Sequence, residues 1–197
     1  VCGIDSRVFR ISFTGELSFE VNVPSRYGRF VWEQFMHHGK KYNITPYGTE
    51  TMHVLRAEKG FIIVGQDTDG SVTPMDMNMD WIVSKKKQDF LGKRSFTRSD
   101  TLRSDRKKFV GLLVNDKKTV LPEGSHIVEK ALKQPPMKML GHVTSSYYSP
   151  ILGHPIALAM IKNGMNLLGE KVEIPLMNGK VIEATLSDTV FYDKEGN

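Results

Sequence analysis

At 197 residues, with 40% apolar and 25% charged residues, the chain has the composition of a globular protein with one large or two small domains, not of a disordered or membrane-spanning chain. Its single cysteine, Cys2, excludes an internal disulfide and a CxxC zinc or redox motif, and it favours a cytoplasmic location. The 27 Lys and Arg outnumber the 22 Asp and Glu, and the net charge of +5 is concentrated between residues 85 and 108.

The first predicted element is a β-hairpin between residues 9 and 23. Apolar and polar residues alternate on both sides of Thr14-Gly15, which interrupts the pattern. This period of two predicts two strands with one face in a core and the other near solvent. Glu16 follows the turn glycine directly, and the pattern alone makes it a solvated hairpin residue. Because Val1 stands directly before this strand and no signal peptide is visible, we expect a piece of a longer or processed polypeptide.

Two helices and a strand are predicted after the hairpin. A helix with apolar residues on one face follows Ser25, which can cap it, and Gly39 can end it. Residues 49–59 predict a second helix that stops at Gly60, and the apolar run 61–64 predicts a buried strand. This order of elements is typical of an α+β lobe.

The second half of the chain changes to short β segments separated by Gly, Pro, Asn or Asp. Seven such segments predict a small antiparallel barrel or sandwich. They are KFVGLLVN, HIVE, LGHVTSSYY, IALAMIK, KVEIPL, VIEATL and TVFY. The boundary falls in the polar stretch 97–108, which gives two domains, 1–104 and 105–197.

Several kinds of site are excluded by their missing residues. No G-x-G occurs, so the dinucleotide fingerprint is absent. The loop 65–71 has the glycine spacing of a P-loop but Ser71 where the lysine belongs, and it lacks the bidentate glutamate of an EF-hand. Asp67 and Asp69 are therefore predicted to anchor loop backbone. No His, Cys or carboxylate grouping predicts a metal site.

The basic segment 85–108 leaves several functions open. Its charge of +7 could belong to a solvated, linker-like face, or it could meet a polyanionic ligand tail, a partner subunit or nucleic acid. Aromatic residues do not alternate with these charges as base stacking requires, so an RNA-binding module is the weaker hypothesis. The basic residues are Lys85, Lys86, Lys87, Lys93, Arg94, Arg98, Arg103, Arg106, Lys107 and Lys108.

The longest recognisable pattern, residues 55–96, reads LRAEKGFIIVGQDTDGSVTPMDMNMDWIVSKKKQDFLGKRSF. It resembles the glycine-cleavage T-protein (aminomethyltransferase) superfamily, which shows Leu-Arg-x-Glu-x-Gly, a Gly-x-Asp-x-Asp loop, Thr-Pro, a Trp-bearing segment and a Lys-rich Asp-Phe-x-Gly. FTGELSFEV, residues 13–21, is similar to the same family's Tyr-Thr-Gly-Glu hairpin, with Phe13 for the Tyr. MLGHVTSSYYSPILGHPIALAMIK and DTVFYDKEG extend the resemblance to the C-terminal part of the α subunits of heterotetrameric sarcosine oxidases.

This resemblance implies an α+β fold, with the second half of a folate-binding aminomethyltransferase-like lobe followed by a small antiparallel β-barrel domain. It implies oxidative demethylation of sarcosine to glycine, with the one-carbon unit captured by tetrahydrofolate as 5,10-methylenetetrahydrofolate. Flavin and NAD would be bound outside this chain. The partners would be the other subunits of a heterotetrameric oxidase and the folate, without nucleic acid or membrane. The alternative within the superfamily is an aminomethyltransferase or a dimethylglycine-type folate enzyme.

The resemblance also gives Glu16 a role, because the family's glutamate after Thr-Gly holds the pterin of tetrahydrofolate. A reduced pterin presents a ring N–H and an exocyclic amine side by side, and an ionised carboxylate accepts such a pair of donors. Phe13 and Thr14 belong to the same turn. Phe191 and Tyr192 could line the folate cleft with their aromatic faces, or they could pack in the core.

Other family features do not transfer. Met52 and His53 stand where T-proteins carry Arg and Asp, so no folate-contacting arginine is expected there. Arg56 matches the family's Leu-Arg arginine, and we expect it to pair with Glu58 or with loop carboxylates. The family's catalytic aspartate and the other half of the folate lobe precede the hairpin and are not in this chain. We therefore assign no catalytic residue and expect the chain alone to be catalytically silent.

Overall fold

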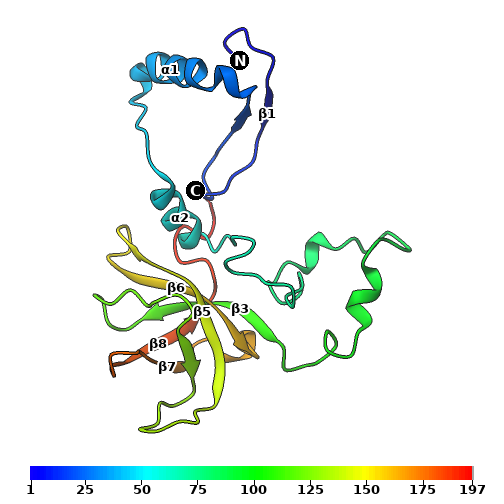
Figure 1. Cartoon of the computed structure of the whole chain (residues 1–197), viewed down its shortest axis with the longest axis vertical. Coiled ribbons are helices and arrows are strands. Elements are labelled where there is room, and N and C mark those ends of the chain that lie inside the picture. Colours follow the sequence, from blue (N-terminus) through cyan, green and yellow to red (C-terminus); the bar gives the residue numbers. More distant parts are fainter. Residues whose placement is uncertain (197) are drawn as a thin grey trace.

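Six strands in the second half of the chain close into an antiparallel barrel (Figure 1). They are β3 (Lys107–Val114), β4 (His126–Val128), β5 (Met139–Ser149), β6 (His154–Lys162), β7 (Lys171–Pro175) and β8 (Val181–Ser187). Their order is β3-β6-β5-β4-β7-β8, and β8 pairs with β3 to complete the closure. The structure, a computed structural model, describes residues 1–196. The α+β class is confirmed, and so is the small antiparallel β-barrel that the family resemblance implied.

The barrel strands alternate between an interior core and an outer apolar cluster. On β6, the small residues Ala157 and Ala159 point inward together with Ile161, and the residues between them point outward. This strand reads as continuously apolar because both of its faces are buried. The interior core also contains Val110, Leu112, Val114, Leu121, Ile127, Val143, Val172, Ile174, Ile182, Ala184 and Leu186.

The outer cluster joins the barrel to helix α2 (Thr49–Glu58) and to the loop that follows it. Ala57 from the helix and Met77 from the loop pack on five outward side chains of β3, β5 and β6. These are Phe109, Tyr147, Ile156, Leu158 and Met160. The helix therefore covers one outer side of the barrel, as its position in Figure 1 also shows.

The first 48 residues extend away from the barrel (Figure 1). They form β1 (Arg7–Phe9), β2 (Glu20–Asn22) and α1 (Gly28–Gly39), with 3-10 turns at Ser25–Tyr27 and Lys40–Tyr42. Further 3-10 turns lie at Asp80–Ile82, Lys93–Thr97 and Gly164–Leu167. The two strands pair antiparallel, so the predicted hairpin is confirmed, although its ladder is shorter than the alternating pattern.

The prediction that one hairpin face lies in a core is wrong for this chain. Leu17 is 72% exposed and Phe19 61% exposed, because no segment of residues 1–196 packs over them. Glu20 on β2 accepts a hydrogen bond from the side chain of Asn22, two residues along the same strand. The apolar residues of the hairpin thus stay at the surface of this chain.

Three predicted local features are also corrected. Ser25 does not cap α1, which begins after a 3-10 turn with no side-chain cap. Residues 61–64 are not a strand, because their backbone is held by side chains: Arg56 donates to the Phe61 carbonyl at 3.0 Å, and Asp67 accepts from the Ile63 N–H at 2.8 Å. The segment 189–192 is not a seventh strand, because its last two N–H groups bond to the carbonyl of Glu58.

A buried ion pair fixes α2 and the following loop to β5. Arg56 is fully buried and donates to Asp67 at 2.6 Å, to Ser145 at 2.6 Å and to Tyr147 at 3.2 Å. Asp67 also accepts from the hydroxyls of Thr144 and Ser145. The expected pairing of Arg56 with a loop carboxylate is thus confirmed, and the partner is Asp67 and not Glu58.

Candidate functional site

The turn at the tip of the hairpin loop rests on the side chain of Lys59. Gly15 has a φ of +86°, and its N–H donates to the hydroxyl of Ser12 at 2.8 Å. A Cβ atom on Gly15 would lie 2.2 Å from Cγ of Lys59, so only glycine allows this approach. Thr14, just before it, is buried, and Glu16, just after it, is exposed. The turn therefore sits on a buried lysine stem, and the exposed Glu16 follows it directly.

Lys59 lies at the C-terminal end of α2 and reaches the last residues that the structure describes. Its ammonium donates to the Asp193 carboxylate at 2.6 Å and to the Asp193 carbonyl at 2.9 Å. It also lies 6.0 Å from the centre of the Tyr192 ring. Residues 15, 59 and 193 are far apart in sequence, and this one side chain brings them together.

The C-terminal segment is held against the end of α2 by backbone hydrogen bonds. The N–H groups of Phe191 and Tyr192 both donate to the carbonyl of Glu58, at 2.8 and 3.1 Å. The carboxylate of Glu58 is buried and accepts from the hydroxyl of Ser149 at 2.6 Å. Phe191 packs against the outer apolar cluster, whereas Tyr192 is 40% exposed. The two neighbouring aromatic residues thus have different environments.

The structure brings the five residues named from the sequence to one region. Phe13, Thr14 and Glu16 come from the hairpin loop, and Phe191 and Tyr192 come from the segment that follows β8; Figure 1 shows the hairpin loop beside the C-terminal end. Lys59 and Asp193 were missed, because a Lys and an Asp 134 residues apart give no local signal. The hydrogen bond from the Phe191 N–H to the Glu58 carbonyl was also missed, because these two residues are far apart in sequence as well.

The chemistry of this region suits a ligand with paired donors and a flat ring. Within residues 1–196 the side chain of Glu16 makes no hydrogen bond or ion pair, so its acceptor oxygens are available. The exposed face of Tyr192 can stack on an aromatic or pterin ring. These residue types can contact such a ligand through one acceptor group and one aromatic face. In the part of the chain described, no group of three His, Cys, Asp or Glu residues could hold a metal ion.

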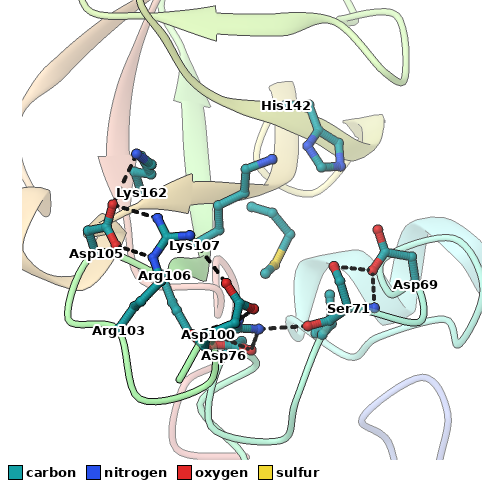
Figure 2. Close-up of a pocket in the computed structure, with 12 residues that line it drawn as sticks. Asp69, Ser71, Asp76, Asp100, Arg103, Asp105, Arg106, Lys107, His142 and Lys162 are labelled. Carbon is teal, nitrogen blue, oxygen red and sulfur yellow. Dashed lines mark hydrogen bonds and ion pairs between the residues drawn. The ribbon is translucent and has the colours of Figure 1, made fainter. Parts of the chain in front are cut away.

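A second constellation is a pocket of about 320 Å³ between the barrel and the segments 69–76 and 100–106 (Figure 2). Its charged residues pair mainly with one another. Arg106 contacts Asp76 and Asp100, each at 2.6 Å, and Arg103 contacts Asp105 at 2.8 Å. Arg106 fastens the basic segment to the loop beneath it through Asp76 and the Ser71 carbonyl, whereas Arg103 pairs with Asp100 and Asp105 inside the segment itself.

The titratable groups of this pocket follow from their surroundings. Burial acts to raise the pKa of Asp76, but hydrogen bonds from Arg106 and Thr73 outweigh it and hold the pKa below its ordinary value. Burial lowers the pKa of His142, and the nearby Lys107 lowers it further. The pocket therefore contains an ionised aspartate and a neutral imidazole at pH 7.

Two family descriptions match the chain over most of its length. The GCVT N-terminal domain matches residues 1–87, and the glycine cleavage T-protein C-terminal barrel domain matches residues 107–193. The second range corresponds to the observed barrel and the segment after β8. No helix among the described residues is long and apolar enough to cross a membrane.

Individual relatives are of two kinds. The chain is 53% identical to the sarcosine oxidase subunit alpha of Corynebacterium sp. strain P-1, over 99% of this chain and 20% of that protein. It is 39% identical to the corresponding subunit of Rhizobium meliloti, over 95% of this chain. An aminomethyltransferase of Thermotoga petrophila is 29% identical over 98% of this chain and 50% of its own length. The chain thus spans about a fifth of the oxidase subunits that it matches.

A solved structure gives the same fold. The glycine cleavage system aminomethyltransferase T from Bartonella henselae superimposes with a TM-score of 0.80 at 24% identity, over 95% of this chain and 50% of the other. At this identity the likeness shows the fold.

Proposed function

The chain belongs to the glycine-cleavage T-protein family, and on that premise we propose that it is the tetrahydrofolate-binding portion of a sarcosine oxidase α subunit. The observation that carries the proposal is the Thr14-Gly15-Glu16 turn: Gly15 rests on the stem of Lys59, whose ammonium lies 6.0 Å from the Tyr192 ring, and the exposed Glu16 follows directly. The 53% identity to an oxidase subunit supports this function over others in the family.

Glu16 binds the pterin in this proposal. Its carboxylate accepts the ring N–H and the exocyclic amine as two parallel, charge-assisted hydrogen bonds. Such bonds contribute about 1.5–3 kcal/mol each beyond those made to water. In the same turn, Thr14 is buried and Phe13 is half-buried. The Gly15 N–H bond to Ser12 and the contact with Lys59 hold the backbone of the turn, which fixes the point from which the carboxylate extends.

Tyr192 lines the folate site, and Phe191 supports it from behind. The Phe191 ring packs on the barrel so closely that a Cβ on Gly111 would lie 2.8 Å from its Cζ. The hydrogen bonds to Glu58 fix the backbone of both aromatic residues. The exposed Tyr192 ring is thereby held at a set distance from α2 and can stack on a flat ligand.

The reaction proposed for the assembled enzyme is oxidation of sarcosine to glycine. When bound, tetrahydrofolate supplies the nucleophilic nitrogen that captures the one-carbon unit as 5,10-methylenetetrahydrofolate. The residues of this chain bind and orient the folate, and none is assigned a catalytic role. Flavin and NAD are bound by other parts of a heterotetrameric, cytoplasmic oxidase. This chain contributes two domains to it, residues 1–104 and residues 105–197.

Product analysis in the assembled oxidase tests this function. With sarcosine, oxygen and tetrahydrofolate, the oxidase is expected to form 5,10-methylenetetrahydrofolate faster than formaldehyde and tetrahydrofolate combine spontaneously. Glu16→Gln is expected to shift the product to formaldehyde while the rate of sarcosine oxidation is kept, because the substitution affects only folate binding. Equal product ratios for the two proteins would contradict the proposal.

Aminomethyl transfer is the second candidate, favoured by the relatives that are aminomethyltransferases over 98% of this chain. Co-purification separates the two functions. A chain isolated with flavin-bearing subunits supports the oxidase, and a chain that copurifies with no flavoprotein supports the transferase.

A further inference from the structure

Lys59 is the point at which three parts of the chain meet. Only 8% of the residue is exposed, although lysine is rarely buried without a partner. Its methylene stem lies under Gly15, and its ammonium contacts the carboxylate and the carbonyl of Asp193. It thus contacts the hairpin turn with one part of its side chain and the C-terminal segment with the other.

The two contacts differ in their physical nature. The stem fills the space below Gly15 by close packing, because Cγ, Cδ and Cε would all lie within 3.0 Å of a Cβ at that position. The ammonium is held by an ion pair that is shielded from water, since the two side chains are 8% and 18% exposed. Removing one partner of such a shielded ion pair costs more stability than removing one partner of an exposed pair.

Glu16 has little else to hold it. Its side chain has no hydrogen-bonding partner within residues 1–196, and its carbonyl accepts only a 3.1 Å bond from the nearby hydroxyl of Ser18. The hairpin strands on either side of the loop are largely exposed. The direction of the carboxylate therefore depends on what lies beneath Gly15, the residue directly before it.

We propose that Lys59 is a positioning residue for folate binding. Its stem supports the backbone of the Glu16 turn from below, and its ion pair with Asp193 fixes the distance from that turn to Tyr192. This inference rests on the proposed function of Glu16. Lys59 itself does not touch the folate in this account. It acts by keeping the two walls of the site at a fixed separation, which is the arrangement that a rigid flat ligand requires.

Substitutions in the assembled oxidase separate the two contributions. Lys59→Ala removes both the stem and the charge, and we expect the dissociation constant of tetrahydrofolate to rise at least tenfold. Lys59→Met keeps most of the stem, and we expect a rise of about threefold. The matched control is Lys194→Met, which breaks an exposed pair with Asp188 in the same segment and should change the constant less than twofold.

Combining Lys59→Ala with Glu16→Gln distinguishes positioning from a general loss of structure. If Lys59 acts through Glu16, its substitution should change folate affinity less than threefold once Glu16 is already Gln, because no correctly placed carboxylate remains to be lost. Full multiplication of the two effects would overturn the inference. The rate of sarcosine oxidation at saturating substrate should stay unchanged in the matched control, Lys194→Met.

The outcomes also separate this inference from the proposed function. If Glu16→Gln leaves the folate dissociation constant unchanged, the assignment of Glu16 fails. If Glu16→Gln weakens binding but Lys59→Ala does not, only the inference about Lys59 fails. Should Lys59→Ala not fold, Lys59→Met and Asp193→Asn carry the same comparison, because each cuts the ion pair while leaving the stem in place.

Discussion

Replacing Arg56 by Met should destabilise the chain strongly, because it leaves a buried carboxylate without its cation. The Arg56 and Asp67 side chains are both 0% exposed, and they meet at 2.6 Å. The substitution also removes the hydrogen bonds from Arg56 to Ser145 and to the carbonyl of Phe61. Methionine fills the space of the stem, so the effect measured is that of the lost charge and its hydrogen bonds.

The expected cost follows from the complete burial of the pair. Removing one partner of a buried ion pair costs about 3–5 kcal/mol, a large part of the roughly 5–15 kcal/mol that stabilises a typical domain. For a chain of this size, about 2–4 °C of melting temperature corresponds to each kcal/mol, so we expect a decrease of roughly 6–20 °C. Arg29→Met is the control, because the Arg29 and Glu33 side chains are 90% and 55% exposed. Such an exposed ion pair contributes about 0.5 kcal/mol or less to stability.

Urea denaturation of the 197-residue chain, followed by circular dichroism, measures the free energy of unfolding of each variant. Asp67→Asn should cost about as much as Arg56→Met, and the double variant should cost less than the sum, because each single variant leaves an unpaired buried group. A cost below about 1 kcal/mol for Arg56→Met, or fully additive single effects, would refute the reasoning.

Three further predictions concern the barrel and the charged pocket. Gly141→Ala should lower the free energy of unfolding by about 1–3 kcal/mol, because its Cβ would lie 2.0 Å from the Met160 carbonyl oxygen, whereas Gly28→Ala in α1 meets nothing within 4 Å and should be neutral or slightly stabilising. Hydrogen bonds hold the native pKa of Asp76 below its unfolded value, so the ionised carboxylate stabilises the fold above the unfolded pKa, and this contribution is lost as the pH falls through the native pKa. Between pH 6 and pH 3 the urea midpoint should therefore decrease less for Asp76→Asn than for the wild type. Parallel curves for the two proteins would contradict this. NMR titration should show that His142 loses its proton at a pH below 6.5, and a midpoint at or above that value would argue against its burial.

The barrel was predictable because each strand carries its own pattern. The run from Ile156 to Ile161 is apolar at every position, which indicates a strand buried on both faces. Closure could not be predicted, because the pairing of β8 with β3 joins segments about 70 residues apart in a register that no local pattern specifies. The strand patterns therefore left a sandwich as open as a barrel, and the barrel was predicted from the family resemblance.

The wrong predictions have a common cause. Residues 61–64 are apolar enough for a strand, but their backbone bonds to Arg56 and Asp67, which only the tertiary fold brings near. The segment 189–192 has strand-forming residues, but its N–H groups find a single carbonyl on α2. In both cases side chains or isolated backbone groups replaced the neighbouring strand that the pattern requires.

The candidate site was predictable only where a motif carried it. Thr14-Gly15-Glu16 stood out by its likeness to a family hairpin, and its role in binding stays a prediction. The contact of Lys59 with Gly15 and Asp193 was not predictable, since none of these residues has a distinctive neighbour in sequence.

An equilibrium titration of tetrahydrofolate into the assembled oxidase, with wild type, Glu16→Gln and Glu20→Gln compared, tests the central claim most directly. Glu20 lies on the same hairpin and its carboxylate bonds to Asn22, so it is the matched control. Glu16→Gln should raise the dissociation constant by roughly 10–150-fold, the equivalent of about 1.5–3 kcal/mol, and Glu20→Gln should leave it within twofold. An unchanged constant for Glu16→Gln, or equal losses for both variants, would contradict the claim that this turn binds the folate.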